Sequence, residues 1–518
     1  MKSHKIDDIW AKMDTEKGDL IERSRAYSRW TVTSVMPEES SANVEAQKGS
    51  VLIGARLVNH LANRIVDVLF PISKPFFTVA LTPEAQLELD SELDENAAAE
   101  AKGAVRDGTA KLEKVAMRKL KLTEYRPVAI LAAKHLIVTG NALLRRMPSG
   151  KRVLYSVDRY GVRRDIEGNE IEVVLHDKKI LSTFEEKTQE LILEYHEHLK
   201  PEDEVVLLTH YKKVGKRWEV KQEADGCALG NDFTLNEKDY DLLVLGWALH
   251  PAEHYARGLV EDHAATFHHI DVTTEATTDL MAIICDVKFL VRPASSLAQD
   301  IGNLNASPRG SYFPGNEGDI TVPELGKRND LGVMMQAIQK WEQDLSQAFL
   351  LSSVRDAERV TAEEIRMIAG ELESSFGGLY SQLAMSWQQK EAEYAISKVD
   401  IAKEVSAQMD IFEVLVTTGL ESLSREGQID NLRMAIGDLQ MMEAVPEDIR
   451  GAMNPLRFAE FVFTNRSVDL KAFLNSQEEM QQNQQAEMEA AGRMQGQQAE
   501  ANVAEHAGKA AVDQQATQ

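Results

Sequence analysis

Two stretches with helical spacing flank a segment rich in turn-forming residues, and this order limits the folds open to the chain. Residues 256–287 and 326–350 each predict a long helix, while residues 288–325 between them are rich in Pro, Gly, Asn and Ser. Short apolar runs at 289–291 and 319–322 indicate brief extended pieces inside that segment. The sequence therefore predicts a small β-rich or extended module held between two long helices.

The second of these helices carries an apolar stripe whose members are three or four residues apart. The stripe consists of Leu331, Met334, Ile338, Trp341, Leu345 and Ala348. This spacing places every member on one face of the helix, as in a heptad seam. Two interpretations are open: the stripe faces a core within the same chain, or it packs against neighbouring subunits.

The rest of the chain alternates between helical and β patterns. Helices are expected over 6–30, 51–70 and 127–144, where apolar residues recur at helical spacing. A β-hairpin is expected from Tyr160–Ile166 and Glu170–Leu175, which are separated by Glu167-Gly168-Asn169. Further strands are expected over 76–81, 205–211, 217–221, 242–249 and 411–417. The predicted fold class is α+β and mainly helical.

A polar segment, residues 351–361, precedes a well-marked helix start. Thr361 and Glu364 form a capping box, in which the threonine hydroxyl accepts a backbone N–H and the glutamate reaches back to the start of the helix. The helical stripe that follows consists of Ile365, Ile368, Leu372, Phe376 and Leu379. Two basic side chains, Arg355 and Arg359, lie in the polar segment before it.

Length and charge bound the class of protein. The chain has 518 residues, enough for roughly three domains. Its net charge of −25 opposes tight binding of a DNA backbone, so either the charge serves solubility or any bound DNA must slide. Two cysteines fit a reducing compartment, and no signal peptide or membrane-spanning run is expected. The Gln- and Ala-rich residues 476–518 predict a weak helix or a disordered tail.

The sequence lacks the common catalytic motifs. It has no G-x-x-x-x-G-K-[ST] phosphate loop, no G-x-S-x-G elbow and no H-E-x-x-H zinc motif. A local group of histidines, His250, His254, His263, His268 and His269, is better explained by packing than by metal binding. No catalytic residue, metal site or cofactor is expected, and a structural or conduit role is favoured.

Several short stretches carry a family resemblance in a fixed order. The most specific runs Arg359-Val360-Thr361-Ala362-Glu363-Glu364-Ile365 and continues through Glu371-Leu372-Glu373 and Phe376-Gly377-Gly378-Leu379-Tyr380. The others are Gly54-Ala55-Arg56, Leu61-Ala62, Leu69-Phe70-Pro71, Gly140-Asn141-Ala142-Leu143-Leu144, Arg164-Asp165, Gly168-Asn169 and Thr418-Gly419-Leu420-Glu421. Together they resemble the head-to-tail connector, or portal, family of short-tailed bacteriophages. One departure is Tyr255-Ala256-Arg257-Gly258, where the family usually begins Tyr-Gly-Arg.

The resemblance implies a ring, usually of twelve subunits, at one vertex of the capsid of the virion, through which double-stranded DNA is packaged and ejected. It also implies a series of domains in a fixed order along the chain, and a protein that is not an enzyme. These are a wing (1–255 and 362–420), two stem helices (256–287 and 326–350), a clip (288–325), a tunnel loop (351–361), a crown (421–475) and a tail or barrel (476–518). Assembly would take place in the host cytoplasm.

Site residues and partners follow from the same resemblance. Arg355 and Arg359 of the tunnel loop are expected to touch DNA phosphates, although solvated charge or an intersubunit ion pair would explain them equally well. The clip residues expected to dock partners, or else to pack locally, are Arg292, Arg309, Tyr312 and Phe313. The implied partners are the large subunit of the terminase motor, the tail adaptor protein, the scaffold protein and the major capsid protein.

Two rival hypotheses belong to other classes. A packaging enzyme, such as a motor or nuclease subunit, is disfavoured by the missing phosphate loop and by the lack of a clustered acidic metal site. A scaffold or internal virion protein does not explain the turn-rich segment between two long helices, and it predicts no central channel.

Overall fold

The structure is a computed structural model, and it divides into two compact units, Met1–Gly419 and Leu420–Gln518. The described residues are 5–37, 53–71, 75–82, 84–85, 91, 95–196, 198–285, 290–293, 302, 320–321, 328–351, 362–399, 412–416, 436–439, 458–459 and 461–463. None of the helices among them is long and apolar enough to cross a membrane.

The first unit begins with two helices where one was expected. α1 (Lys5–Glu16) and α2 (Gly18–Trp30) are interrupted at Lys17, whose backbone leaves the helical geometry. The Lys17 side chain is buried and donates from Nζ to the carbonyls of Val157 and Tyr160 at 3.1 and 2.9 Å. Burial lowers the pKa of this ammonium to about 8. The break therefore anchors α1 and α2 to η2 (Val157–Arg159) and the strand after it.

Three helices form the centre of the first unit. α3 (Gly54–Leu69) packs on α6 (Tyr125–Thr139), and α5 (Glu95–Leu122) contacts both α6 and β1 (Phe77–Leu81). The inner face of α3 is fully buried, as its helical stripe predicts. α6 ends at Gly140 in a left-handed conformation (φ 78°), so residues 141–144 form a strand instead of the last turn of the expected helix.

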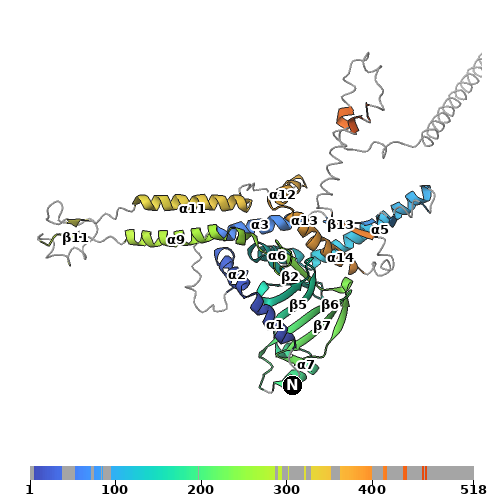
Figure 1. Ribbon diagram of the computed structural model, residues 1–518. Helices are drawn as coiled ribbons and strands as arrows, with labels where there is room; N and C mark the ends of the chain where they lie inside the picture. The colour runs from blue at the N-terminus through green and yellow to red at the C-terminus, as the bar shows by residue number, and fades with distance from the viewer. Residues whose placement is uncertain are drawn as a thin grey trace, which may run out of the picture. The chain divides into compact units, whose positions relative to one another are not determined.

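A larger antiparallel sheet follows in the order β4-β5-β6-β7-β8. Its strands are β4 (Tyr160–Arg164), β5 (Glu170–Ile180), β6 (Glu204–Val214), β7 (Arg217–Ala224) and β8 (Cys227–Ala228), with β9 (Phe233–Asn236) also paired to β7. The expected hairpin is confirmed, because Tyr160 pairs with Leu175 in β4 and β5. The helix α7 (Glu186–Tyr195) and the 3-10 turns η3 (Leu181–Thr183) and η4 (Glu237–Asp239) lie in its connections. Figure 1 shows α1 lying along this sheet.

A smaller antiparallel sheet has the order β10-β2-β3. Its strands are β10 (Leu242–Gly246), β2 (Asn141–Arg146) and β3 (Arg152–Tyr155). A third pair joins β1 to β13 (Phe412–Val416), which confirms both expected strands and brings the end of the first unit back to the strand that follows α3.

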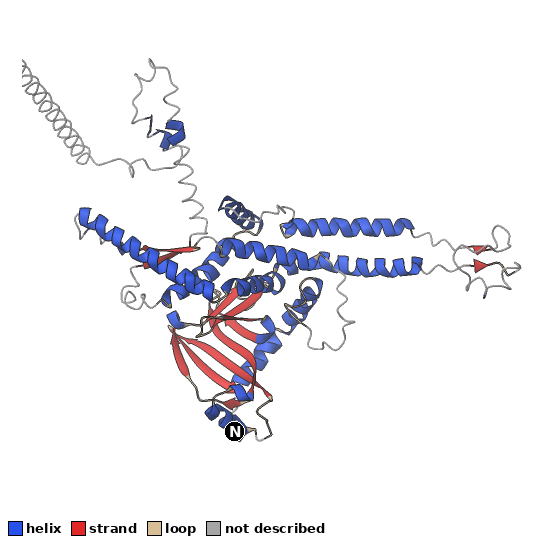
Figure 2. Cartoon of the chain, turned by 180° about the vertical axis from the view of Figure 1, so that it is seen from behind, coloured by secondary structure: helices blue, strands red, loops and turns tan. Residues whose placement is uncertain are grey.

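A pair of helices extends from this body (Figure 2). α9 (Ala264–Cys285) lies beside α11 (Arg328–Ala348), and β11 (Leu290–Val291) pairs with β12 (Ile320–Thr321) in the chain between them. The helix expected over 256–287 was too long at its start. An extended backbone at Gly258 and the short helix α8 (Leu259–Asp262) come before α9.

The chain then returns to the body through four helical elements. They are α12 (Ala362–Ser375), α13 (Leu379–Leu383), the π-helix η7 (Ala384–Gln389) and α14 (Lys390–Ser397). α12 starts directly after Thr361, as the capping box predicts, and Ile368, Leu372 and Leu379 of the expected stripe are buried. In the second unit, Val462 and Phe463 cluster with Leu439 and Phe458, while the rest of 421–475 and all of 476–518 lie outside the described residues.

Candidate functional site

The α9–α11 pair is antiparallel and is joined by an aromatic seam. Phe267 of α9 meets Phe349, just after α11, edge to face at a centroid distance of 6.0 Å. One half-turn further along α9, His269 stacks on Trp341 of α11 at 5.7 Å. Residues early in α9 therefore lie beside residues late in α11, and the seam fixes the register of the two helices.

The base of the pair is its best-packed part. Phe267, Ile270, Leu345 and Phe349 are at most 1 % exposed. Each such side chain contributes about 2 kcal/mol through burial of apolar surface. Trp30 of α2 stacks over Phe267 and donates from Nε1 to Asp271 Oδ2 at 3.2 Å, so the pair is also tied to the N-terminal helices.

Away from its base the apolar stripe of α11 is half-buried. Leu331, Met334, Ile338, Trp341 and Ala348 are all intermediate in exposure, and Leu345 is buried. Because Trp341 stacks on α9 of the same chain and Leu345 is buried, the later part of the stripe packs within one chain. A different set of apolar side chains is exposed on the two helices. It consists of Val272, Met281, Val333 and Met335, which are 52 %, 39 %, 66 % and 45 % exposed.

The pair is acidic where its side chains are described. Asp271, Glu275 and Asp279 of α9 follow one another at steps of four residues, so they lie on one face. Over residues 331–348, α11 adds Glu342 and Asp344 and a single basic residue, Lys340. A phosphate backbone is repelled by such a surface, because binding requires Lys and Arg to replace its counterions.

A close backbone contact joins α9 to the body. The Asn141 side chain accepts from the N–H of Ala256 at 2.9 Å and donates to its carbonyl at 2.7 Å. Gly140 and Gly258 lie back to back. A Cβ on Gly140 would sit 2.5 Å from the carbonyl carbon of Arg257, and one on Gly258 would sit 2.7 Å from the Gly140 nitrogen. Only glycine fits this contact at either position, so the Gly140 stretch packs directly against the segment that departs from the family pattern.

Arg64 of α3 contacts the chain on both sides of the segment after α11, at its start and within α12. Arg64 donates from Nη1 to the Leu350 carbonyl and to Glu371 Oε2 of α12, both at 3.2 Å. Leu350 has a left-handed backbone (φ 55°), so the chain turns sharply at the start of this segment. Burial, and then the nearby Arg64 charge, lower the pKa of His60, one turn earlier in α3. Arg355 and Arg359, which lie between Leu350 and Glu371 in the sequence, fall outside the described residues.

The expected docking residues are only partly visible. Arg292 directly follows β11 and is exposed. The pairs Leu290–Thr321 and Val291–Ile320 close the described part of the module between α9 and α11. Arg309, Tyr312 and Phe313 fall outside the described residues, so Arg292 is the one candidate of this set that the structure places.

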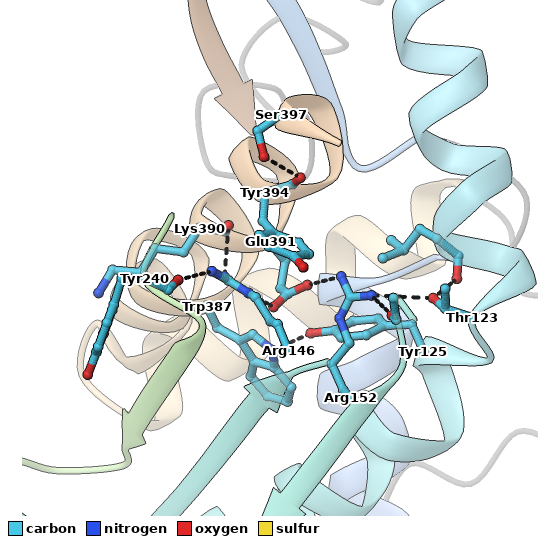
Figure 3. A network of polar contacts seen from close by, with 12 residues as sticks. Thr123, Tyr125, Arg146, Arg152, Tyr240, Trp387, Lys390, Glu391, Tyr394 and Ser397 are labelled. Atoms are coloured by element: carbon cyan, nitrogen blue, oxygen red, sulfur yellow. Dashed lines mark hydrogen bonds and ion pairs between the residues drawn. The ribbon is translucent and has the colours of Figure 1, made fainter. Parts of the chain in front are cut away.

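A buried charged network, which the sequence reasoning missed, holds the returning helices to the small sheet (Figure 3). Arg146 and Arg152, from β2 and β3, donate to the two carboxylate oxygens of Glu391 of α14 at 3.0 and 2.7 Å. Glu391 is fully buried, and the two guanidinium groups are 7 % and 3 % exposed. Both also lie over the ring of Tyr394. We call Arg146, Arg152 and Glu391 the buried triad.

Comparison with known proteins decides the family. A family model described as bacteriophage head to tail connecting protein matches residues 3–474. The chain belongs to this family. It is 30 % identical over 484 residues to the portal protein of Enterobacteria phage SP6, covering 92 % of this chain and 91 % of that protein. It is 26 % identical over 522 residues to the portal protein of Escherichia phage T7, covering 98 % and 96 %.

The family match extends over nearly all of the chain. It includes the body, the α9–α11 pair and the returning helices. The function of the chain is accordingly that of a portal, the head-to-tail connector of a phage particle.

A solved structure titled as the virion of a native gene transfer agent particle is also similar to this chain. The match covers 74 % of this chain and 85 % of the solved chain, at 10 % identity and a TM-score of 0.33. This overlap is too loose to carry an argument.

Proposed function

We propose that this connector assembles as a closed ring of twelve copies, whose α9–α11 pairs form the stem around a channel for double-stranded DNA. The family match over residues 3–474 carries the proposal, since it spans both helices and the module between them. A closed ring requires two different surfaces on each copy, which meet head to tail. The four apolar side chains exposed on α9 and α11 provide one such surface, because neighbouring copies would cover them.

The charge of the pair supports a channel through which DNA slides. Its described side chains include five carboxylates and one ammonium group. Acidic helices keep DNA from adhering along the channel, and contact is then left to a few basic groups. We assign that role to Arg355 and Arg359, in a tunnel loop that Arg64 flanks through Leu350 before it and Glu371 of α12 after it. Their contacts would be weak and sensitive to salt.

The remaining parts follow the same plan. Residues 1–255 and 362–420 would form the wing, 421–475 the crown, and 476–518 the tail or barrel. The module over 288–325 would form the clip, with Arg292, Arg309, Tyr312 and Phe313 contacting the terminase large subunit and then the tail adaptor. During assembly in the host cytoplasm the ring would meet the scaffold and major capsid proteins. The role is structural, without catalysis by this chain.

Negative-stain imaging of the purified chain, combined with native mass measurement, tests the ring. Rings with a central channel and a mass of about twelve copies are expected. A monomer or dimer at every salt concentration tried would overturn the proposal. A closed ring with another subunit number would correct the stoichiometry and retain the channel.

A further inference from the structure

The side of α9 that faces away from α11 carries exposed acidic side chains. Val272, Glu275 and Asp279 follow one another at steps of three and four residues, so they lie on one face of the helix. All three are exposed. Ile270 and Thr277, on the other side of α9, are buried, as the contact between α9 and α11 requires. We call Val272, Glu275 and Asp279 the acidic stripe.

The side of α11 that faces away from α9 carries a different set of polar groups. Gln336, Lys340, Gln343 and Gln347 recur at steps of three and four residues, and all of them are exposed. The apolar stripe that packs toward α9 lies on the opposite side of this helix. The set combines three amides with one ammonium group and contains no carboxylate. We call these four residues the glutamine–lysine stripe.

The charged groups of both stripes are available for new contacts. Among the residues that the structure describes, Lys340, Glu275 and Asp279 make no ion pair and no side-chain hydrogen bond. Asp271, one turn before Glu275, differs from them because it already accepts from Trp30 of α2. The part of α9 without contacts to α2 therefore begins at the acidic stripe, and its carboxylates need a partner from outside the chain.

The two stripes cannot meet within one copy, because they lie on the outward faces of two helices that pack against each other. A second copy beside the first would bring the acidic stripe of one against the glutamine–lysine stripe of the next. Such a contact joins two different surfaces head to tail, which is the arrangement of a closed ring. Contact between two acidic stripes would instead place carboxylates against carboxylates, which is unfavourable.

The stripes also lie at matching levels along the pair. Lys340 directly precedes Trp341, which stacks on His269. The two contacts of the aromatic seam therefore place Lys340 level with residues 270–276 of α9. Rotation about an axis along the pair keeps each residue at its level. The axial distance between Lys340 of one copy and Glu275 of the next is then at most about 8 Å, which two extended side chains can span.

We propose that Lys340 of each copy forms an ion pair with Glu275 of the next copy around the ring. Gln336, one turn from Lys340, would donate its amide to Asp279 in the same contact. This inference rests on the proposed ring and adds the charged groups through which neighbouring copies recognise each other. A second copy fits the acidic stripe better than DNA does, because phosphates are repelled by carboxylates. The other carboxylates of the two helices keep the stem acidic.

Charge reversal in two separate chains tests the proposal. Lys340→Glu places a second carboxylate opposite Glu275 at every contact, and Glu275→Lys places a second ammonium opposite Lys340. Each single variant is expected to need about tenfold more protein than the wild type to form rings at low salt, as measured by native mass. In an equal mixture the two variants can alternate, and every contact then joins opposite charges. Rings with equal numbers of each variant, one of them isotope-labelled, should form within about twofold of the wild-type concentration.

The controls separate folding from assembly. Lys187→Glu, on exposed α7 outside the stem, is the matched charge reversal and should form rings like the wild type. Denaturant unfolding of Lys340→Glu and Glu275→Lys should match the wild type, because both side chains are exposed. A ring with an odd number of copies would leave one contact mismatched and would still show the rescue in the mixture.

The outcomes distinguish this pairing from the ring itself. A wild-type chain that forms no rings would overturn the proposed function, and the pairing with it. Wild-type rings, together with single variants that assemble equally well, would overturn the pairing alone and leave the ring in place. Impaired single variants that the mixture does not rescue would show that the two charges act within one chain or face the channel, and would also refute the pairing.

Discussion

The body around the buried triad and the α9–α11 pair bury their surfaces in different ways. In the body, charges as well as apolar groups are enclosed within one chain, and the Glu391 carboxylate is fully covered. In the pair, only the base is closed, and side chains such as Val333 remain 66 % exposed. Both regions leave some apolar side chains exposed, but in the described residues the body also encloses paired charges, and in the proposed ring neighbouring copies would cover the exposed side chains of the pair. Stability and assembly should accordingly respond to substitutions in different regions.

The largest effect is expected at Glu391. Glu391→Gln leaves two buried guanidinium charges without a counter-charge, which costs about 3–5 kcal/mol of unfolding free energy. The measurement is denaturant unfolding of the body. Glu393→Gln, an exposed neighbour on the same helix, is the control and should stay within about 0.5 kcal/mol of the wild type. Equal losses of unfolding free energy in the two variants would show that the buried triad stabilises the body no more than an exposed carboxylate does.

Glycine substitutions contrast the two regions directly. Gly140→Ala places a methyl group 2.5 Å from the Arg257 backbone at a left-handed position, and should destabilise the body by about 3 kcal/mol. Gly332→Ala in exposed α11 meets nothing within 4 Å and should stabilise that helix by about 1 kcal/mol. Hydrogen–deuterium exchange by peptide reports both: faster exchange in α6 and α9 for the first, slower exchange in α11 for the second. Slower exchange in Gly140→Ala would refute the close backbone contact.

The smallest effect on folding, with the largest effect on assembly, is expected at Val333. Val333→Asp should change the unfolding free energy by less than about 0.5 kcal/mol, because the side chain is exposed. It should nevertheless shift the mass distribution from rings toward single copies, since it places a charge in the proposed contact between copies. Val214→Asp, at a 51 % exposed position in β6, is the matched control. Rings that survive Val333→Asp would remove α11 from the interface.

The sequence predicts the local elements better than their long-range contacts. Periodicity locates α3, the β4–β5 hairpin and α11, because each pattern is read within about twenty residues. Periodicity starts the expected helix over 256–287 too early. The backbone before α9 is held extended at Gly258 by its contact with Gly140, and these two residues are more than a hundred positions apart. The buried triad is missed for the same reason, because Arg146 and Glu391 are 245 positions apart.

The expected DNA contacts have a different basis from these elements. Arg355 and Arg359 come from the family resemblance and the polar character of their segment, and they stay predictions. The structure adds Arg64, which no local pattern indicates, because its contacts with Leu350 and Glu371 depend on the approach of α3 to the end of α11 and to α12. The sequence pattern of α3 predicts only a helix of the core. In the structure the same helix also contacts the chain before and after the proposed tunnel loop.

Arg64 has a mechanical consequence. A single guanidinium binds the carbonyl of Leu350 and the carboxylate of Glu371, which lie on opposite sides of residues 352–361. A pull on that segment from either direction is thus transmitted to α3, whose inner face is fully packed against the body. In the proposed ring, part of the load that passing DNA places on this segment would therefore reach the packed body through α3 and not only the end of α11.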